Sequence, residues 1–557
     1  MRKNIFRELT EEKWQQIITH PFYQPIIEEI KAKSEEFLNS EPPRIKFSDM
    51  HVYYTVGSRQ PHERNREEYI QRLVNHKFMY LYTKDEKYLP FIEDIIWDMC
   101  GFETWSRPYS FNEGGELERR AINLDLGSTD MGYHIAEALY LIGDKLHPLV
   151  YRRARAEVQR RIIDAYANND DFWWMNTTLN WAAVCTGNIM STYILLATDE
   201  EIEAQLPRML RTFELYMSGF DEDGCCPEGL GYRAYGFTHY CKGASMLRDY
   251  TDGRIDLFRD EKVHKVARFQ QNAIINETEV IAFSDSGMVF APSRSFTHFL
   301  KTQYDDIIVP PMKEPHTLGD LRTLCWMNPD YESEALRPES VIFRGAQWFV
   351  HRTPVYSLAC KGGSNGEPHN HNDVGSFVIS KGGAGCSTFL DPGIGEYTRQ
   401  YFDPELRYTH VLTSSRGHSV PIIDGNYQVI GKEKCTVTAA SENEYAFDMQ
   451  QAYQLDNLKR LNRSFVCKEA SFTLTDTYSF ESAPQCVTER FISLEEPKLV
   501  GGKVKVGESY LVFDPEVFEL SFSSENGRRG GKDIPVYFTD LKIKNPAKEM
   551  QVSVRFE

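Results

Sequence analysis

The hydrophobic pattern of this 557-residue chain changes its period once, near residue 335. Before that point apolar residues recur at helical spacing, as Tyr69, Leu73 and Leu81 do within segment 65–82. Short polar loops separate the runs, which predicts antiparallel helix pairs with short connections. Further helical runs are expected at 130–146, 147–166, 180–197, 200–218, 232–250 and 257–276.

After residue 335 the chain is rich in β-branched and aromatic residues and has no helical period, beginning with 341–363. Strands are expected there and at 376–383, 411–425, 435–449, 464–480 and 503–513. An all-β region of about 220 residues suits a sandwich. The polar segment 328–340 contains two prolines and reads as a linker. Because the chain is too long for one ordinary domain, we expect a helical domain over 1–335 and a β domain over 336–557.

The segment EPHNHNDVGSF (367–377) places His369 and His371 two residues apart, with Asp373 after them. In a strand both histidines would face the same side, and a tight turn would also bring them together. With Asp391 and His418 downstream, two imidazoles and a carboxylate form a plausible zinc set. From the spacing alone, hydrogen-bonded loop residues on a sheet surface are the simpler explanation.

Two segments of the helical region carry further candidates. In WWMNTTLNWAAVC (173–185), Asn180 precedes Trp181 at an expected helix start, where asparagine is a good N-cap. In DEDGCCPEGLGYRAYGFTHY (221–240), a turn precedes Tyr232 and Tyr235, one turn apart on a helix. Half-buried packing tyrosines are the simple structural alternative for this pair.

Taken together, the patterns NWxxVC, DGxxPEGxxY, and HxHxD followed by DPG and GHxxxxxDG resemble the heparinase II/III-like family over roughly residues 120–425. The resemblance implies an incomplete (α/α) toroid followed by an antiparallel β-sandwich, with the active site in the cleft between them. It also implies a polysaccharide lyase that cuts uronate-containing glycans by β-elimination.

The chemistry of such a lyase sets what the site must contain. The C5 proton of a uronate becomes acidic only when the neighbouring carboxylate is stabilised, so that negative charge can build there. A base then removes the C5 proton and an acid protonates the departing O4. A tyrosine hydroxyl can serve, and we expect nearby cationic groups to lower its pKa. The product is a 4,5-unsaturated uronate, made without water.

The resemblance assigns roles residue by residue. Tyr232 takes the position of the catalytic tyrosine, with Tyr235 as its rival, and His369 that of the catalytic histidine. Asn180 takes the position of the residue that neutralises the carboxylate, where several relatives have histidine, and Asn176 is an alternative. The resemblance also implies further substrate-binding candidates and the ligands of a structural zinc ion: Trp181, Glu228, Arg416, Tyr397 and Tyr401 for substrate, and His371, Asp391 and His418 for metal.

The formal net charge of -18 argues against a nucleic-acid partner, because phosphate binding needs a basic surface. An acidic polysaccharide or oligosaccharide substrate would then need a local basic patch. The candidates for this patch are Arg119, Arg120, Arg152, Arg153, and Arg407 with Arg416.

No run of 18 apolar residues predicts a membrane span, and no apolar run follows the basic N-terminus as in a secretion signal. The 11 cysteines are scattered and odd in number, which is typical of a reduced, cytosolic set. We therefore expect a cytoplasmic enzyme acting on imported oligosaccharides, or a periplasmic or secreted one if a leader has been removed.

Two other classes of protein stay open. A glycoside hydrolase on a helical toroid would need two carboxylates across the scissile bond, for which Glu228 and Asp285 are available. A non-catalytic glycan-binding protein could also keep the fold. The lyase interpretation favours glycosaminoglycans such as heparan sulfate, chondroitin sulfate or hyaluronan, with alginate or another polyuronate as the alternative. It leaves open endo or exo action, the identity of the metal and the oligomeric state.

Overall fold

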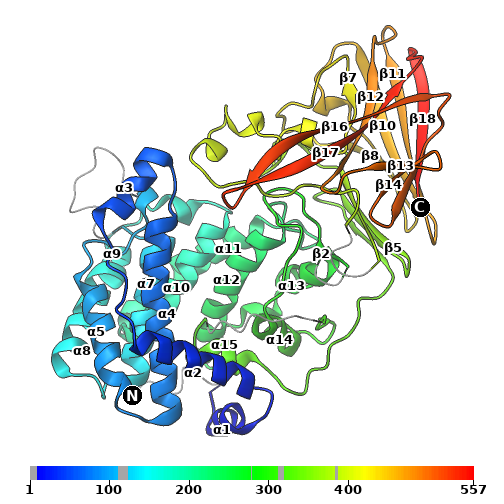
Figure 1. The fold of residues 1–557 in the computed structure, drawn as a ribbon. Coiled ribbons are helices and arrows are strands. Elements are labelled where there is room, and N and C mark those ends of the chain that lie inside the picture. Colours follow the sequence, from blue (N-terminus) through cyan, green and yellow to red (C-terminus); the bar gives the residue numbers. More distant parts are fainter. Residues whose placement is uncertain (1–8, 111–122, 277–278, 312–318, 383–386) are drawn as a thin grey trace.

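The computed structural model describes residues 9–110, 123–276, 279–311, 319–382 and 387–557. Helices fill the chain up to Trp326, and antiparallel sheets dominate from Ser340 onward (Figure 1). The predicted order of a helical N-terminal region and a C-terminal region of antiparallel strands is confirmed. None of the described helices is long and apolar enough to cross a membrane.

The helices follow the apolar periodicity of the sequence, and several begin at an N-cap side chain, as α7 does at Asp125. The described helices are α1 (Glu11–Thr19), α2 (Gln24–Leu38), α3 (Phe47–Val56), α4 (Gln60–Thr83), α5 (Tyr88–Gly101), α7 (Leu126–Ile142), α8 (Pro148–Val158), α9 (Asp164–Ala167), α10 (Asn180–Leu196), α11 (Asp199–Ser218), α12 (Leu230–Tyr250), α13 (Glu261–Ala273), α14 (Arg294–Gln303) and α15 (Leu321–Trp326).

The strands form a two-stranded hairpin, two four-stranded sheets and one eight-stranded sheet in the described part of the chain. The hairpin pairs β1 (Ile274–Asn276) with β2 (Glu279–Val280). One four-stranded sheet runs β3 (Ser340–Phe343), β4 (Trp348–Arg352), β5 (Tyr356–Lys361), β6 (Phe377–Lys381). The other runs β16 (Phe518–Arg529), β17 (Lys532–Ile543), β12 (Val487–Ser493), β7 (Ile422–Ile423). The eight-stranded sheet runs β13 (Lys498–Val500), β14 (Lys503–Val506), β15 (Ser509–Val512), β18 (Glu549–Phe556), β11 (Phe472–Phe480), β10 (Leu458–Cys467), β9 (Glu444–Asp448), β8 (Thr436–Ala440).

The β3–β6 sheet lies between two hydrophobic cores and contributes side chains to both. On β4, Trp348 and Val350 belong to the core of the helical region, whereas Phe349 between them belongs to the core of the sheets. Ala359 and its neighbour Leu358 on β5 divide between the cores in the same way. Because successive strand residues face opposite sides, both faces of this sheet are buried. This burial explains why the apolar residues of these strands show neither a helical spacing nor an alternation with polar residues.

One expectation about local structure was too long and another was wrong. The helix expected at 257–276 is confirmed over Glu261–Ala273, after which the chain continues into the hairpin of β1 and β2. The strand expected at 411–425 is mostly loop, with only β7 paired. Val411 and Leu412 pack under β12 and β17 as part of a separate apolar cluster, so their hydrophobicity stabilises a loop rather than a strand.

The turn before α12 is docked on a loop that follows the hairpin. Gly229 has a φ of 95°, and a Cβ there would lie 2.7 Å from the Cβ of Ser286. The hydroxyl of Ser284 donates to the carbonyl of Pro227 at 2.9 Å. Glycine is therefore needed for two reasons, the left-handed backbone and the close approach. This contact brings Glu228 and Tyr232 beside Asp285.

Loops from the two regions meet where the site forms. The chain between β6 and β8, coloured yellow in Figure 1, lies between the green helices and the orange and red strands. Two arginines on the tip of the β16–β17 hairpin hold part of it. Arg529 donates from Nε to the carbonyl of Ile394 at 2.7 Å and also binds the carbonyl of Pro392, and Arg528 pairs with Glu396.

Candidate active site

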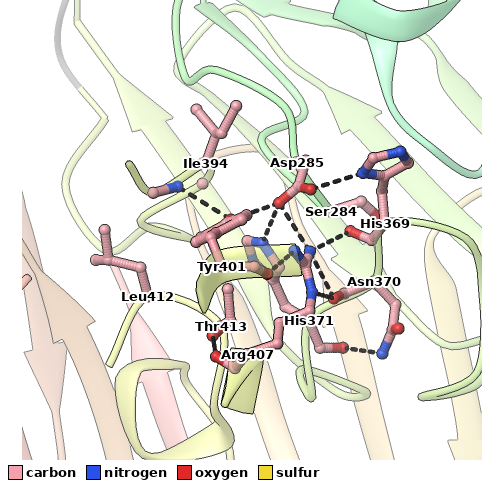
Figure 2. Close-up of polar contacts among 12 residues, drawn as sticks. Ser284, Asp285, His369, Asn370, His371, Ile394, Tyr401, Arg407, Leu412 and Thr413 are labelled. Carbon is pink, nitrogen blue, oxygen red and sulfur yellow. Dashed lines mark hydrogen bonds and ion pairs between the residues drawn. The ribbon is translucent and has the colours of Figure 1, made fainter. Parts of the chain in front are cut away.

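Asp285 is a buried carboxylate that gathers side chains from the sheet region (Figure 2). Its Oδ2 accepts a hydrogen bond from Nδ1 of His369 at 2.8 Å. Its Oδ1 accepts from three groups: the Tyr401 hydroxyl at 2.5 Å, an Arg407 guanidinium nitrogen at 2.9 Å, and Nε2 of His371 at 3.1 Å. Burial would raise the pKa of Asp285, but the hydrogen bonds from both histidines and the charge on Arg407 hold it well below its usual range.

With its oxygens occupied by four donors, Asp285 is an anchor. The hydrolase alternative required it as a free general acid or base, and these contacts disfavour that role. Two of the residues that frame it have left-handed backbones: Ser284 with a φ of 61° and His369 with a φ of 56°. Such strain at non-glycine residues persists only where surrounding contacts enforce it, and it is concentrated at functional sites.

His369 and His371 converge on one group, as the motif predicted, but that group is Asp285, which the motif did not indicate. Both histidines lie in a loop before β6 and not in a strand. The left-handed conformation of His369 turns their rings to different environments. The His369 side chain is 22 % exposed and lines a cavity, whereas His371 is fully buried among other ligand-type side chains.

Tyr232 and His369 lie against each other, with ring centroids 4.3 Å apart and planes inclined by 31°. The Tyr232 hydroxyl is 2.6 Å from the hydroxyl of Tyr397, which comes from the loop after β6. Burial raises the pKa of both hydroxyls, and the charge on Asp285 raises them further. The expected lowering by cations is therefore wrong for the site as it stands. The positive charge of Arg407 acts to lower the pKa of Tyr232, but Arg407 forms an ion pair with Asp285.

Tyr235 projects from the same helix as Tyr232 and also lines the cavity. Burial raises the pKa of its hydroxyl to about 12, with Arg107 acting in the opposite direction. No described contact links it to His369 or Asp285. The two tyrosines thus occupy different parts of one cavity wall.

Asn180 is the first residue of α10, and its side chain does not cap the helix, because the N-cap position is Leu179. The N-cap explanation is wrong. The side chain is 8 % exposed, lines the cavity, and has no hydrogen-bond partner among the described residues. Trp181 lines the cavity too, packed between Trp173 and Tyr109. Asn176, exposed at the end of a short 3-10 turn, does not line it.

The cavity between the helical region and the sheet-region loops measures about 880 Å³, which is ample for an oligosaccharide segment. Three arginines line it: Arg59, Arg107 and Arg399. They place positive charge in the cavity lining despite the net charge of -18, although Arg59 and Arg107 share Glu63 as an ion-pair partner at 3.6 and 3.4 Å. Its aromatic lining comes from both regions: Tyr53, Tyr109, Trp181, Tyr232, Tyr235, Tyr397 and Phe402.

Of the arginines expected from sequence, those that the structure describes do not form this patch. Arg152 and Arg153 lie on α8 away from the cavity, with Arg153 over the Trp97 ring. Arg407 lies behind Asp285, and Arg416 pairs with Glu525 at 2.9 Å without lining the cavity. Arg119 and Arg120 lie outside the described residues. Sequence spacing gave no signal for Arg59, Arg107 or Arg399, because each comes from a different segment of the chain.

Four buried side chains form a set with metal-ligand character behind His369: His371, Asp373, Asp391 and His418. One ligand atom from each lies within 4.8 Å of the others. Nδ1 of His371 and Oδ2 of Asp373 are buried and have no hydrogen-bond partner among the residues that the structure describes, which suits atoms that would hold a cation. Burial lowers the pKa of His371, which favours the neutral imidazole that metal binding requires.

One contact of this set also fits a metal centre. Nε2 of His371 is bound to Asp285, the outer carboxylate contact that orients a ligating imidazole. Two other contacts already partly satisfy the carboxylates without a metal: Asp391 accepts from Nδ1 of His418 at 2.9 Å, and Lys361 donates to Asp373 at 2.6 Å. Sequence analysis named three of the four residues and quoted Asp373 only as part of the motif.

Two further predicted residues lie at the edge of the site. Glu228 does not line the main cavity, and its Oε2 is 4.0 Å from Nε2 of His369. Tyr401 is buried, supports Asp285 and does not reach the cavity. Tyr397 is therefore the tyrosine of this pair that a substrate could touch.

No protein-family model and no curated protein matches the sequence. Solved structures do match the fold. A heparinase III superposes with a TM-score of 0.63 at 12% identity, covering 97% of this chain and 91% of that one. The heparan sulfate lyase of Pedobacter heparinus gives 0.59 at 12% identity, covering 98% and 90%. The chondroitin AC lyase of Streptomyces coelicolor, solved with chondroitin sulphate, gives 0.58 at 12% identity, covering 98% and 81%. The chain therefore has the fold of heparinase II/III-like polysaccharide lyases, as its motifs predicted.

Proposed function

We propose that this protein is a polysaccharide lyase that cleaves uronate-containing glycosaminoglycans by β-elimination. The observation that carries the proposal is the convergence of Asn180, Tyr232 and His369 on one cavity with an arginine lining. The fold similarity agrees, since the proteins named above are heparan sulfate and chondroitin lyases. The substrate is an acidic polysaccharide or oligosaccharide.

In this proposal Asn180 binds the uronate carboxylate. Its amide is unpartnered within the described structure and can donate to a carboxylate oxygen without losing an existing bond. A donor placed where charge builds in the transition state lowers the barrier more than one that only binds the ground state. The arginines of the cavity attract the rest of the polyanion.

His369 is the proposed base and Tyr232 the proposed acid. Because Asp285 accepts a hydrogen bond from Nδ1 of His369, Nε2 is the ring nitrogen left to take the C5 proton. Burial raises the pKa of Tyr232, so its hydroxyl keeps its proton until O4 departs. Tyr397 donates to or accepts from Tyr232 and fixes the orientation of that hydroxyl.

His371, Asp373, Asp391 and His418 would hold a divalent metal, proposed as zinc. Such an ion would neutralise the two carboxylates and tie together three loops of the sheet region. The proposed role is structural, because the set is fully buried and does not line the cavity. In the reaction, the role of His371 is to hold Asp285 in place, and Asp285 in turn holds His369.

We further propose the finer architecture that the resemblance implies: an incomplete (α/α) toroid over 1–335 and a β-sandwich over 336–557. The stretch between Trp326 and Ser340, which has no helix or strand, supports this boundary.

The test is to incubate the protein with heparan sulfate, chondroitin sulfate, hyaluronan and alginate, as polymers and as short oligosaccharides. Elimination produces a conjugated 4,5-unsaturated uronate, which is followed by its ultraviolet absorbance. A rise in absorbance on any of them is expected. New reducing ends without that absorbance would mean hydrolysis and would overturn the proposal.

A further inference from the structure

A small recess lies next to the main cavity and shares Asn180 and Tyr232 with it as lining residues. Its volume is about 50 Å³. A single water needs roughly 10–15 Å³ on this measure, so the recess has room for a group with two oxygens, such as a carboxylate. Thr178, Tyr216 and Glu228 complete its polar lining.

Polar atoms in this recess lack partners. Oε2 of Glu228 and the hydroxyl of Tyr216 are both buried, and neither has a hydrogen-bond partner in the described parts of the chain. Glu228 is only 8 % exposed. A buried polar group without a partner costs about 1–3 kcal/mol of stability. Two such groups in one recess therefore favour the binding of a polar ligand group there.

Burial, more than the charges around it, favours the protonated form of Glu228. Burial raises its pKa; the nearby His369 acts in the opposite direction, and the negative charge on Asp285 raises it further. The other titratable groups facing it are Cys226 of the same turn, Tyr216 of α11 and Tyr232 of α12. None of these carries a cation that would hold Glu228 ionised.

We propose that Glu228 is a carboxylic acid in the resting site and donates a hydrogen bond to the uronate carboxylate, which enters the recess beside Asn180. This inference rests on the proposed function and assigns the second donor of its carboxylate-binding site. A carboxylic acid and a carboxylate share one proton, so the pair carries one negative charge instead of two. The substrate carboxylate is then partly neutralised, which is the condition for removing the C5 proton.

A competing role would make Glu228 an ionised partner for a protonated His369. The distance of 4.0 Å between Oε2 and Nε2 is too long for the hydrogen bond that this role needs. In that role the negative charge is essential, whereas in the proposed role only the donor is essential. A glutamine at this position therefore separates the two, because its amide donates and is never charged.

The experiment compares Glu228→Gln, Glu228→Ala and the surface control Glu214→Gln on hyaluronan oligosaccharides and on their uronate methyl esters. The methyl ester needs no neutralisation. On the acid substrate we expect kcat/KM to fall by less than about ten-fold for Gln, and by about 10²–10³-fold for Ala, the usual cost of removing one such donor. On the methyl ester the Ala defect should shrink to less than about ten-fold.

A glutamine variant as inactive as the alanine variant, with unchanged melting temperature, would overturn the inference and leave the lyase function standing. An alanine defect of equal size on acid and ester would do the same. If the unaltered protein eliminates neither substrate nor any other uronate glycan, the proposed function fails and this inference falls with it.

Discussion

Nδ1 of His369 lies 2.8 Å from Oδ2 of Asp285, and this hydrogen bond determines which imidazole nitrogen faces the cavity. Asp285 belongs to the helical region and His369 to the sheet region, so the bond also joins the two. Oδ1 of the same carboxylate binds Arg407 and His371. The positions of His369, Arg407 and His371 therefore all depend on the side chain of Asp285.

Asp285→Asn should lower kcat by several orders of magnitude, up to about 10⁴-fold, because an amide donor opposite Nδ1 stabilises the tautomer whose Nε2 carries the proton. Arg407 would lose its anion, so we expect the free energy of unfolding to fall by about 3–5 kcal/mol. Kinetics and denaturant unfolding measure the two effects. Asp305→Asn, at an exposed position, is the control. Unchanged kcat in a folded variant would contradict the anchor role.

Tyr232→Phe should lower kcat by about 10²–10⁴-fold, the usual contribution of a positioned proton donor, and leave circular dichroism unchanged. Tyr235→Phe is the matched control on the same helix face, and we expect a small effect on KM only. If Tyr232→Phe keeps near-full activity and Tyr235→Phe does not, the acid role moves to Tyr235.

His371→Ala should lose bound divalent metal and lower the melting temperature, on the order of 5 °C or more, because two buried carboxylates are then left less well compensated. Metal analysis of the purified protein and a thermal melt with and without chelator measure both. His264→Ala, on the surface of α13, controls for loss of an imidazole. Equal metal content and equal melting temperature in His371→Ala and the unaltered protein would refute the metal site.

Glu367, at the start of the HxH loop, gives a pH-dependent stability with a definite sign. Burial raises its pKa to about 7, although Lys361 opposes the shift. A carboxyl whose folded pKa lies above its unfolded value of about 4.3 stabilises the fold at low pH, and this contribution is lost as pH rises toward 7. Glu367→Gln should therefore melt above the unaltered protein at pH 8 and lose this advantage at pH 5. A difference in melting temperature that does not change with pH would show that Glu367 is ionised throughout.

The helix-then-sheet order could be predicted because periodicity is a local property of the sequence. The meeting of His371, Asp391 and His418 was implied by the family resemblance, since their spacing alone favoured ordinary loop residues. The central role of Asp285 could not be predicted, because its four donors lie 84 or more residues away along the chain. The lining arginines escaped prediction for the same reason. The strand expected at 411–425 failed because loop residues that pack under a sheet can be as apolar as strand residues.

The arrangement of Tyr232 against His369 predicts which uronates are cut. Their rings are 4.3 Å apart and form one wall of the cavity, so a bound sugar meets the base and the acid from the same side. In glucuronate the C5 hydrogen and O4 project from the same face of the ring, whereas in iduronate they project from opposite faces. Correct orientation of both groups accounts for much of such a rate. We expect hyaluronan and chondroitin sulfate to be cleaved much faster than the iduronate linkages of dermatan sulfate, as measured by ultraviolet absorbance and by analysis of the residual polymer. Faster cleavage of the iduronate linkages would mean that acid and base approach from opposite faces and would reassign one of the two roles.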